Sequence, residues 1–145
     1  MGDAVMNRED RAMLTTGAAR VDITPPLGTH IPGLFHERQA EVIHDPLCAR
    51  AFVIDREGSA IVVVVCDLIG VKREHIDQAK ALIAANTPLP PDRVLVCCTH
   101  THSGAQTGND AYTAFVVQRI ADAVRLAWEG RTSGAVGWGV GHEDR

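Results

Sequence analysis

The sequence predicts an α/β domain, with a mixed sheet that contains a βαβ unit and carries packed helices. Residues 60–68 and 93–98 are apolar runs of strand length, and residues 72–85 between them repeat apolar side chains at helical spacing. A crossover of this kind makes its two strands parallel. The length of 145 residues and the hydrophobic content of 46% suit one domain with a real core.

The first 26 residues predict a tail and one short strand. Residues 1–16 are mixed and polar, so we expect a flexible tail before a domain that extends over residues 17–145. Val21 and Ile23 alternate with polar residues, which predicts a strand. The two prolines after Thr24 are expected to end it, because proline cannot donate a ladder hydrogen bond.

A long loop and a hairpin follow. The loop covers residues 27–47 and shows no periodicity; it is too apolar for plain disorder, and ordered loops of this length are usually functional. Residues 48–55 and 60–68 predict two strands joined by a tight turn, and therefore an antiparallel hairpin. The apolar run Ile61–Val65 indicates that the second of these strands is covered on both faces.

The last third predicts a helix and a strand. Residues 111–130 carry the second amphipathic pattern. Asn109 or Asp110 is expected to cap its start, and Gly130 to end it. The glycine-rich residues 133–141 predict a final strand.

Charge and hydropathy argue against several classes of partner. The chain has 14 Lys and Arg against 18 Asp and Glu, a formal charge of −4, so it offers no basic surface for nucleic acid and no polybasic membrane anchor. Its opening residues show neither a signal peptide nor a transmembrane segment. We expect a cytoplasmic location, or a secreted one if a leader has been lost.

The cysteines do not have the spacing of a disulfide framework. Most of them lie in apolar runs that predict strands, so we interpret them as small buried side chains in a reducing compartment. The four are Cys48, Cys66, Cys97 and Cys98.

The clearest chemical signal is a His-x-His pair that directly follows the second strand of the βαβ unit. Because the carboxyl ends of parallel strands meet at one edge, we expect Asp67, His100 and His102 to share a rim. In extended backbone, residues two apart point to the same side, so the two imidazoles would converge. Two converging imidazoles suit zinc or another borderline metal.

The residues after the pair favour a ligand as well. Gly104 and Gly108 allow the loop to fold closely around a bound group. The helix that begins near residue 110 would direct backbone N–H groups toward the rim, which favours an anion or a developing oxyanion.

Other interpretations stay open. The histidines could be ordinary hydrogen-bonded side chains, and Asp67 could only cap a turn. A structural Cys/His zinc site or a catalytic thiol at Cys98 is a further alternative, although the adjacent Cys97 should point to the opposite face. His75 is expected on an exposed helix face. Three loop histidines could line the same cleft: His30, His36 and His44.

Four segments resemble the neutral/alkaline, non-lysosomal ceramidases. They are GAARVDITPPLG, HDPLCARAFVID, VVVVCDLIG and THTHSG, in that order. The resemblance covers about residues 17–142, and THTHSG after an apolar strand is its most specific element. It implies a zinc-dependent amidase that cleaves ceramide, or a related lipid amide, into sphingosine and a fatty acid, with zinc activating a water molecule.

The resemblance also implies roles for individual residues. His100 matches a zinc ligand. His102 matches the second histidine of the motif, which lines the active site, so we expect it to be catalytic through substrate or oxyanion contact, with ligation as the alternative. Asp67 matches an acidic residue near the site and is also predicted to be catalytic. Ser103 and Gly104 are predicted to bind substrate.

Two features depart from the family. The motif commonly continues with Pro-Gly, whereas this chain reads THTHSGAQTGND, so its substrate preference is expected to differ. The family's catalytic domain is far longer, and its remaining ligands, a His, a Glu and a Tyr, come from downstream segments. We therefore expect an N-terminal portion of such a domain, with exposed apolar surface and little activity alone.

Two hypotheses follow for the site. The missing C-terminal part of the domain, or a homo-oligomer, could supply the further ligands. Alternatively, the chain is a non-catalytic α/β module that binds metal or another subunit through the same rim.

Overall fold

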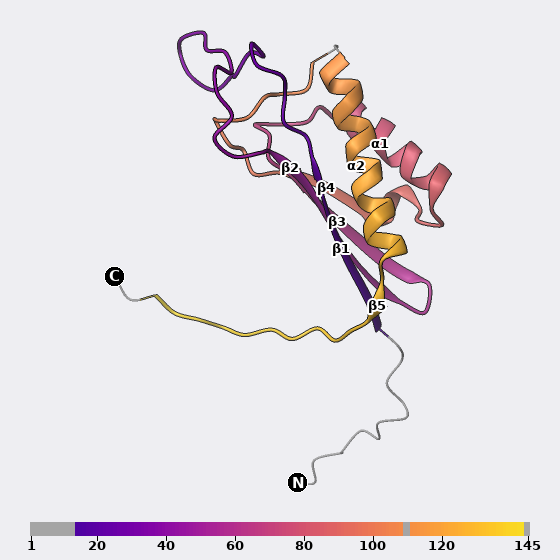
Figure 1. Cartoon of the computed structure of the whole chain (residues 1–145). Helices are drawn as coiled ribbons and strands as arrows, with labels where there is room; N and C mark the ends of the chain where they lie inside the picture. Colours follow the sequence, from indigo (N-terminus) through magenta and orange to yellow (C-terminus); the bar gives the residue numbers. More distant parts are fainter. Residues whose placement is uncertain (1–13, 109–110, 144–145) are drawn as a thin grey trace, which may run out of the picture.

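In the computed structural model, which describes residues 14–108 and 111–143, a mixed sheet is covered on one face by two helices (Figure 1). The strands are β1 (Leu14–Asp22), β2 (Cys48–Arg56), β3 (Ser59–Cys66), β4 (Val94–Cys98) and β5 (Thr132–Ser133); the helices are α1 (Arg73–Asn86), α2 (Ala111–Glu129) and the short 3₁₀ helix η2 (Pro91–Arg93). Their order in the sheet is β4-β3-β2-β1-β5. The predicted α/β class with a mixed sheet is confirmed.

The predicted hairpin and βαβ unit are both present. β2 and β3 pair antiparallel around a two-residue turn, in which Glu57 and Gly58 have φ angles of 51° and 85°. This pair of positive angles is that of a type I′ turn, whose twist matches the strands. β3 and β4 pair in parallel across α1. The carboxyl ends of β3 and β4 therefore lie at one edge, as expected.

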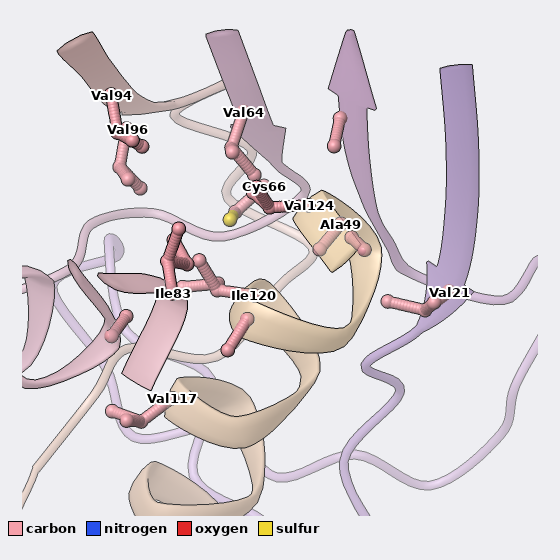
Figure 2. Packing of buried hydrophobic residues seen from close by; sticks show 14 of the residues in the cluster. Val21, Ala49, Val64, Cys66, Ile83, Val94, Val96, Val117, Ile120 and Val124 are labelled. Carbon is pink, nitrogen blue, oxygen red and sulfur yellow. The ribbon is translucent and has the colours of Figure 1, made fainter. Parts of the chain in front are cut away.

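The core lies between the sheet and α2. Ile120 and Val124 of α2 are fully buried and face the buried side chains of the strands, among them Val64 (Figure 2). Ile83 of α1 packs into the same cluster. Apolar side chains at the 3/4 spacing thus form one stripe on each helix, and burial of these stripes holds both helices to the sheet.

The prediction that the strand at 60–68 is covered on both faces is wrong. Val62 and Val64 point into the core, whereas Ile61 and Val63 lie on the opposite face, where Ile61 is 49% exposed. No described helix or strand lies over that face, which is called the open face below. An apolar run shows that both faces suit burial, but it does not show what covers the second.

The first strand is longer than predicted at its start. β1 begins at Leu14, so residues 14–16 of the predicted tail pair with β2, while residues 1–13 lie outside the described part. Ile23 follows the strand and is fully buried. The alternation of Val21 and Ile23 with polar residues therefore reflects that both side chains are buried, not that β1 extends to Ile23.

The predicted final strand over 133–141 is mostly wrong. Thr132–Ser133 pairs with β1, and the N–H of Gly134 donates to the carbonyl of Leu14. Residues 135–143 run away from the body of the molecule as an extended segment (yellow in Figure 1). Glycine at alternate positions leaves few side chains to pack on a neighbouring strand. The helix before it ends at Glu129, where the N–H of Gly130 donates to the carbonyl of Leu126, while the predicted caps Asn109 and Asp110 lie outside the described residues.

Within the described ranges, no helix combines the length and the apolar character needed to cross a membrane.

Candidate functional site

The two motif histidines lie together just beyond β4. The ring centroids of His100 and His102 are 5.2 Å apart, and the rings meet edge to face at 70°. The predicted convergence is confirmed, but its cause differs. His100 has φ of 59°, in the left-handed region, and a turn follows at residues 102–103, so the backbone is not extended here. Histidine is one of the few side chains that populate this region.

The ring of His100 is held by the segment that follows β3. Its Nδ1 lies 2.8 Å from the carbonyl oxygen of Ile69. Since a carbonyl only accepts, we assign the proton to Nδ1, which leaves the lone pair of Nε2 free. This is the arrangement typical of a metal-ligating histidine, in which the second nitrogen is fixed by a backbone carbonyl.

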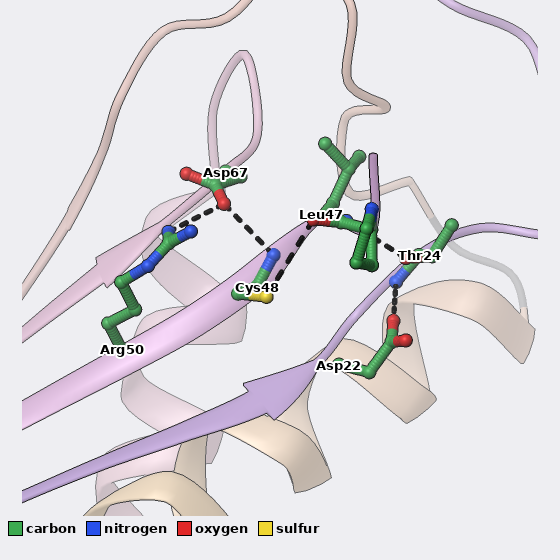
Figure 3. Close-up of polar contacts among 7 residues, drawn as sticks. Asp22, Thr24, Leu47, Cys48, Arg50 and Asp67 are labelled. Atoms are coloured by element: carbon green, nitrogen blue, oxygen red, sulfur yellow. Dashed lines mark hydrogen bonds and ion pairs between the residues drawn. The ribbon is translucent and has the colours of Figure 1, made fainter. Parts of the chain in front are cut away.

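Asp67 joins the ends of two strands. Its Oδ2 accepts hydrogen bonds from the backbone N–H of Cys48 at 3.0 Å and from Nη1 of Arg50 at 2.6 Å (Figure 3). The hydrogen bond to this carboxylate raises the pKa of Arg50. Within the described contacts the Asp67 side chain bonds neither motif histidine. The structure thus places it at the same edge as the pair, but as a brace between β2 and β3.

Ser103 and Gly104 pack the motif loop against the end of β3. A Cβ atom on Gly104 would lie 2.8 Å from the carbonyl oxygen of Asp67, so only glycine permits this approach. Ser103 is exposed, and its backbone N–H donates to Oγ1 of Thr101. Its side chain lines a cavity shared with the long loop.

The long loop closes onto His102 through contacts that sequence reasoning missed. Gly33 has φ of 101°, and a Cβ atom there would lie 2.8 Å from Nδ1 of His102. The guanidinium of Arg38 donates to the backbone carbonyl of His102. The glycine after Pro32 signals a turn, but nothing in the sequence signals its partner.

The three loop histidines do not join the pair. His44 bonds the neighbouring Asp45 at 2.9 Å, His30 lines a separate cavity beside Thr107, and His36 is exposed. Over the residues that the structure describes, no group of three His, Cys, Asp or Glu side chains is placed to hold a metal ion. The described part of the chain therefore provides two neighbouring imidazoles rather than a complete site.

The expectation that His75 lies on an exposed helix face is wrong. The residue is only 3% exposed, and its Nδ1 lies 2.9 Å from Oγ1 of Thr107. The same hydroxyl oxygen accepts from the backbone N–H of Lys72 at 3.1 Å. The start of α1 is thus tied to the loop that follows the motif, a long-range contact that helical periodicity does not reveal.

The cysteines are poor candidates for chemistry. Burial raises the pKa of the Cys66 thiol to about 12 and also raises that of Cys98, so both thiols stay protonated at neutral pH. Cys98 packs against the core, while Cys97 alternates to the other face. The opposed directions of the adjacent cysteines are confirmed, and neither a Cys98 nucleophile nor a paired Cys/His site is favoured.

No protein-family model matches the sequence, and no curated protein is significantly similar to it. Among solved structures, the chain is similar to the neutral ceramidase from Pseudomonas aeruginosa, with a TM-score of 0.71 and 24% identity over 86% of this chain and 23% of that chain. A ceramidase complexed with C2 gives a TM-score of 0.73 and 23% identity over 85% of this chain and 22% of that chain. The chain therefore spans less than a quarter of the structures that it matches.

Proposed function

We propose that the chain, whose fold is shared with part of the neutral ceramidases, belongs to a zinc-dependent amide hydrolase that acts on ceramide or a related lipid amide. The observation that carries the proposal is the paired histidines, with Nδ1 of His100 bonded to the carbonyl of Ile69 and Nε2 left free. The same fold in neutral ceramidases supports the reaction class.

The described residues fit one part of a zinc site. His100 would ligate through Nε2, and His102 would either ligate or contact the substrate amide. A catalytic zinc usually has three protein ligands, so further ligands would come from outside the described residues or from another chain. When bound, zinc would polarise the amide carbonyl and lower the pKa of a water molecule.

The residues after the histidine pair would form the part of the site that contacts the substrate. Ser103 presents an exposed hydroxyl beside His102, and Gly104 lets the loop lie close to β3. A catalytic role for Asp67 stays a prediction. Its bonds to Cys48 and Arg50 support a positioning role instead, since they hold the segment after β3 in which Ile69 lies.

Zinc content tests the motif assignment. We would measure zinc by elemental analysis in the purified chain, in His100→Ala and in His36→Ala, a control in which an exposed loop histidine is removed. We expect stoichiometric zinc in the parent chain and the control, and its loss in His100→Ala. Equal zinc in all three proteins would show that the metal binds elsewhere.

Amide turnover tests how complete the site is. Because the described residues offer only two neighbouring imidazoles, we expect little or no ceramide hydrolysis by the 145-residue chain alone. Robust turnover that a chelator abolishes would mean that this chain supplies every ligand that catalysis needs.

A second candidate is a non-catalytic module that binds metal or another subunit. The open face favours it, because apolar side chains there are exposed in a pattern that suits a covering layer. This candidate predicts a stable complex with another chain or copy that shows no amide turnover with zinc present.

A further inference from the structure

We infer that residues 135–141, called the arm below, pair as a strand with β1 of a second copy of this chain. The site on β1 is the edge that faces β5, over residues 17–22. The arm of the second copy would bind the first in the same way, because an interface about a two-fold axis repeats itself. The inference goes beyond the proposed function, since neither the arm nor this edge includes a motif histidine.

The edge of β1 that faces β5 is paired only at its start. β5 pairs with residues 15–16, and the carbonyl of Leu14 accepts from the N–H of Gly134. Successive residues of an antiparallel strand direct their N–H and C=O groups to opposite edges, so Ala18 and Arg20 point the same way as Leu14. Along the described part of the chain, no strand pairs with Ala18 or Arg20 on this side. Their backbone groups are therefore a template for a further strand.

The arm carries its apolar side chains on one side. Val136, Trp138 and Val140 are 53%, 92% and 86% exposed. In extended backbone, alternate residues point to the same side, so these three form one apolar row. The other side of the arm has no side chains between them, because the intervening residues are Gly137, Gly139 and Gly141.

The two faces of the sheet at this edge match the two sides of the arm. On the helix side, α2 lies so close to β1 that a Cβ atom on Gly17 would lie 2.0 Å from the carbonyl oxygen of Ala127, so glycines suit that side. On the open face, Ala18 pairs with Phe52, and an indole beside the small alanine would reach the phenyl ring. Trp138 would thus cover part of a hollow of about 870 Å³ that Ala18 and Phe52 line.

The arm of the same copy is directed away from this edge. Because β5 is antiparallel to β1 and Ser133 pairs with Thr15, the chain after Gly134 passes the start of β1 and leaves the body of the molecule there (Figure 1). Ala18 and Arg20 lie in the opposite direction along β1. The arm could reach them in its own copy only by reversing around β5, whereas the arm of a second copy can approach without a turn. The register therefore favours a second copy.

The main rival is direct stacking of two open faces, which needs no arm. Stacking would leave the Trp138 side chain in water, together with the backbone groups of Ala18 and Arg20. The two arrangements therefore differ in which substitutions weaken association, and the experiment can separate them.

Sedimentation equilibrium of the full chain measures the dissociation constant of the dimer. We expect a closed dimer that Trp138→Ser weakens at least about ten-fold. Ten-fold corresponds to about 1.4 kcal/mol, and burial of a large apolar side chain contributes at least that much.

Ala18→Pro tests the edge itself. Proline removes the N–H that points away from β2 and leaves the ladder between β1 and β2 intact, so the variant should fold. We expect a dimer at least about five-fold weaker, because a hydrogen bond is lost at each of two equivalent junctions. Circular dichroism would check that the fold is retained.

Phe35→Ser is the matched control, since Phe35 is a fully exposed aromatic side chain of the long loop. We expect it to have the dissociation constant of the parent chain. A parent chain that stays monomeric would overturn the inference, and so would a dimer that neither Trp138→Ser nor Ala18→Pro weakens. Association that Phe52→Lys weakens and Ala18→Pro does not would indicate stacking of open faces and would also overturn it.

Tryptophan emission separates a second copy from the same copy. The difference between the spectra of the parent chain and Trp138→Phe reports Trp138, because Trp128 is present in both. We expect this difference spectrum to move to shorter wavelength as protein concentration rises, since the indole leaves water on dimerisation. Short-wavelength emission from a monomer at every concentration would assign the arm to its own copy and contradict the inference.

Discussion

His100 combines an uncommon backbone conformation with a fixed ring. A non-glycine residue in the left-handed region costs free energy, and it persists only where its surroundings determine it. Here the bond from Nδ1 to the carbonyl of Ile69 fixes the ring, and the turn at residues 102–103 brings His102 alongside. The conformation therefore directs one free imidazole nitrogen outward beside a second ring.

Removal of the Asp67 carboxylate should destabilise the strand ends. In Asp67→Ala the buried N–H of Cys48 and the guanidinium of Arg50 lose their common acceptor. We expect a loss of about 1–3 kcal/mol in the free energy of unfolding, measured by urea denaturation. Asp77→Ala, which breaks the exposed pair with Arg73, should cost less than about 0.5 kcal/mol. Equal losses would contradict the bracing role.

Buried thiols should make stability fall at alkaline pH. The folded protein raises the pKa of Cys66 from 9.0 to about 12, mainly through burial. Between these values the folded state holds a proton that the unfolded chain releases, so stability is full below pH 9 and declines as pH rises toward 12. We expect the urea midpoint to drop between pH 8 and pH 11, with a smaller drop in Cys66→Ala. The same slope in both proteins would exclude Cys66 as the cause.

For single residues, the sequence predicted positions but not contacts. The end of a buried strand correctly placed His100 and His102 at one edge, but the rings meet through the left-handed His100 and the turn that follows rather than through extended backbone. The contacts of Gly33 and Arg38 with His102 could not be predicted, because the loop that carries them has no periodicity and its approach depends on tertiary packing.

Helix α2 packs so closely on β1 that its backbone leaves no room for a side chain at Gly17. A Cβ atom on Gly17 of β1 would lie 2.0 Å from the carbonyl oxygen of Ala127 in α2, so the helix backbone rests directly on the strand. The absence of a side chain at this position sets the distance between the helix and the sheet, and with it the position of the core stripe.

Substitution of Gly17 should disturb this contact. Gly17→Ala must push the helix away or shift the strand, which we expect to cost at least about 1–3 kcal/mol of unfolding free energy. Gly70→Ala is the control, because a Cβ atom there meets no atom within 4 Å and its φ is not positive. Thermal denaturation of both variants checks this. A Gly17→Ala protein as stable as the parent would show that α2 is free to move.

Elements with strong local patterns were predicted well. The hairpin and the βαβ unit follow from apolar runs, a helical repeat and a short turn, all of which are local signals. The glycine-rich segment 133–141 was predicted to be a strand, but only its first residues bond to β1, because pairing depends on a neighbour that its own sequence does not specify. His75 was misplaced for the same reason, since its partner Thr107 comes from a distant loop.

The whole molecule presents two layers, with helices on one face of the sheet and exposed apolar side chains on the other. The open face carries Phe52, Ile61 and Leu95, each more than two-fifths exposed. A surface of this kind marks an interaction site or an aggregation liability. This chain spans less than a quarter of the length of the ceramidase structures that it matches.

Self-association should follow from the open face. We expect sedimentation velocity to show a sedimentation coefficient that rises with protein concentration, because apolar side chains remain in contact with water. Phe52→Lys should reduce the rise. Phe115→Lys is the matched control, since Phe115 is 42% exposed on α2 and Phe52 is 43% exposed on the open face. An equal effect of both changes would exclude the open face as the contact surface.

X-ray absorption spectroscopy at the zinc edge of the zinc-loaded chain would show whether the histidine pair holds the metal through imidazole nitrogen. We expect nitrogen and oxygen neighbours at about 2.0–2.2 Å, with multiple scattering from imidazole and no sulfur. Sulfur neighbours at about 2.3 Å would instead assign the metal to the cysteines, and the histidine pair would then not be the metal site.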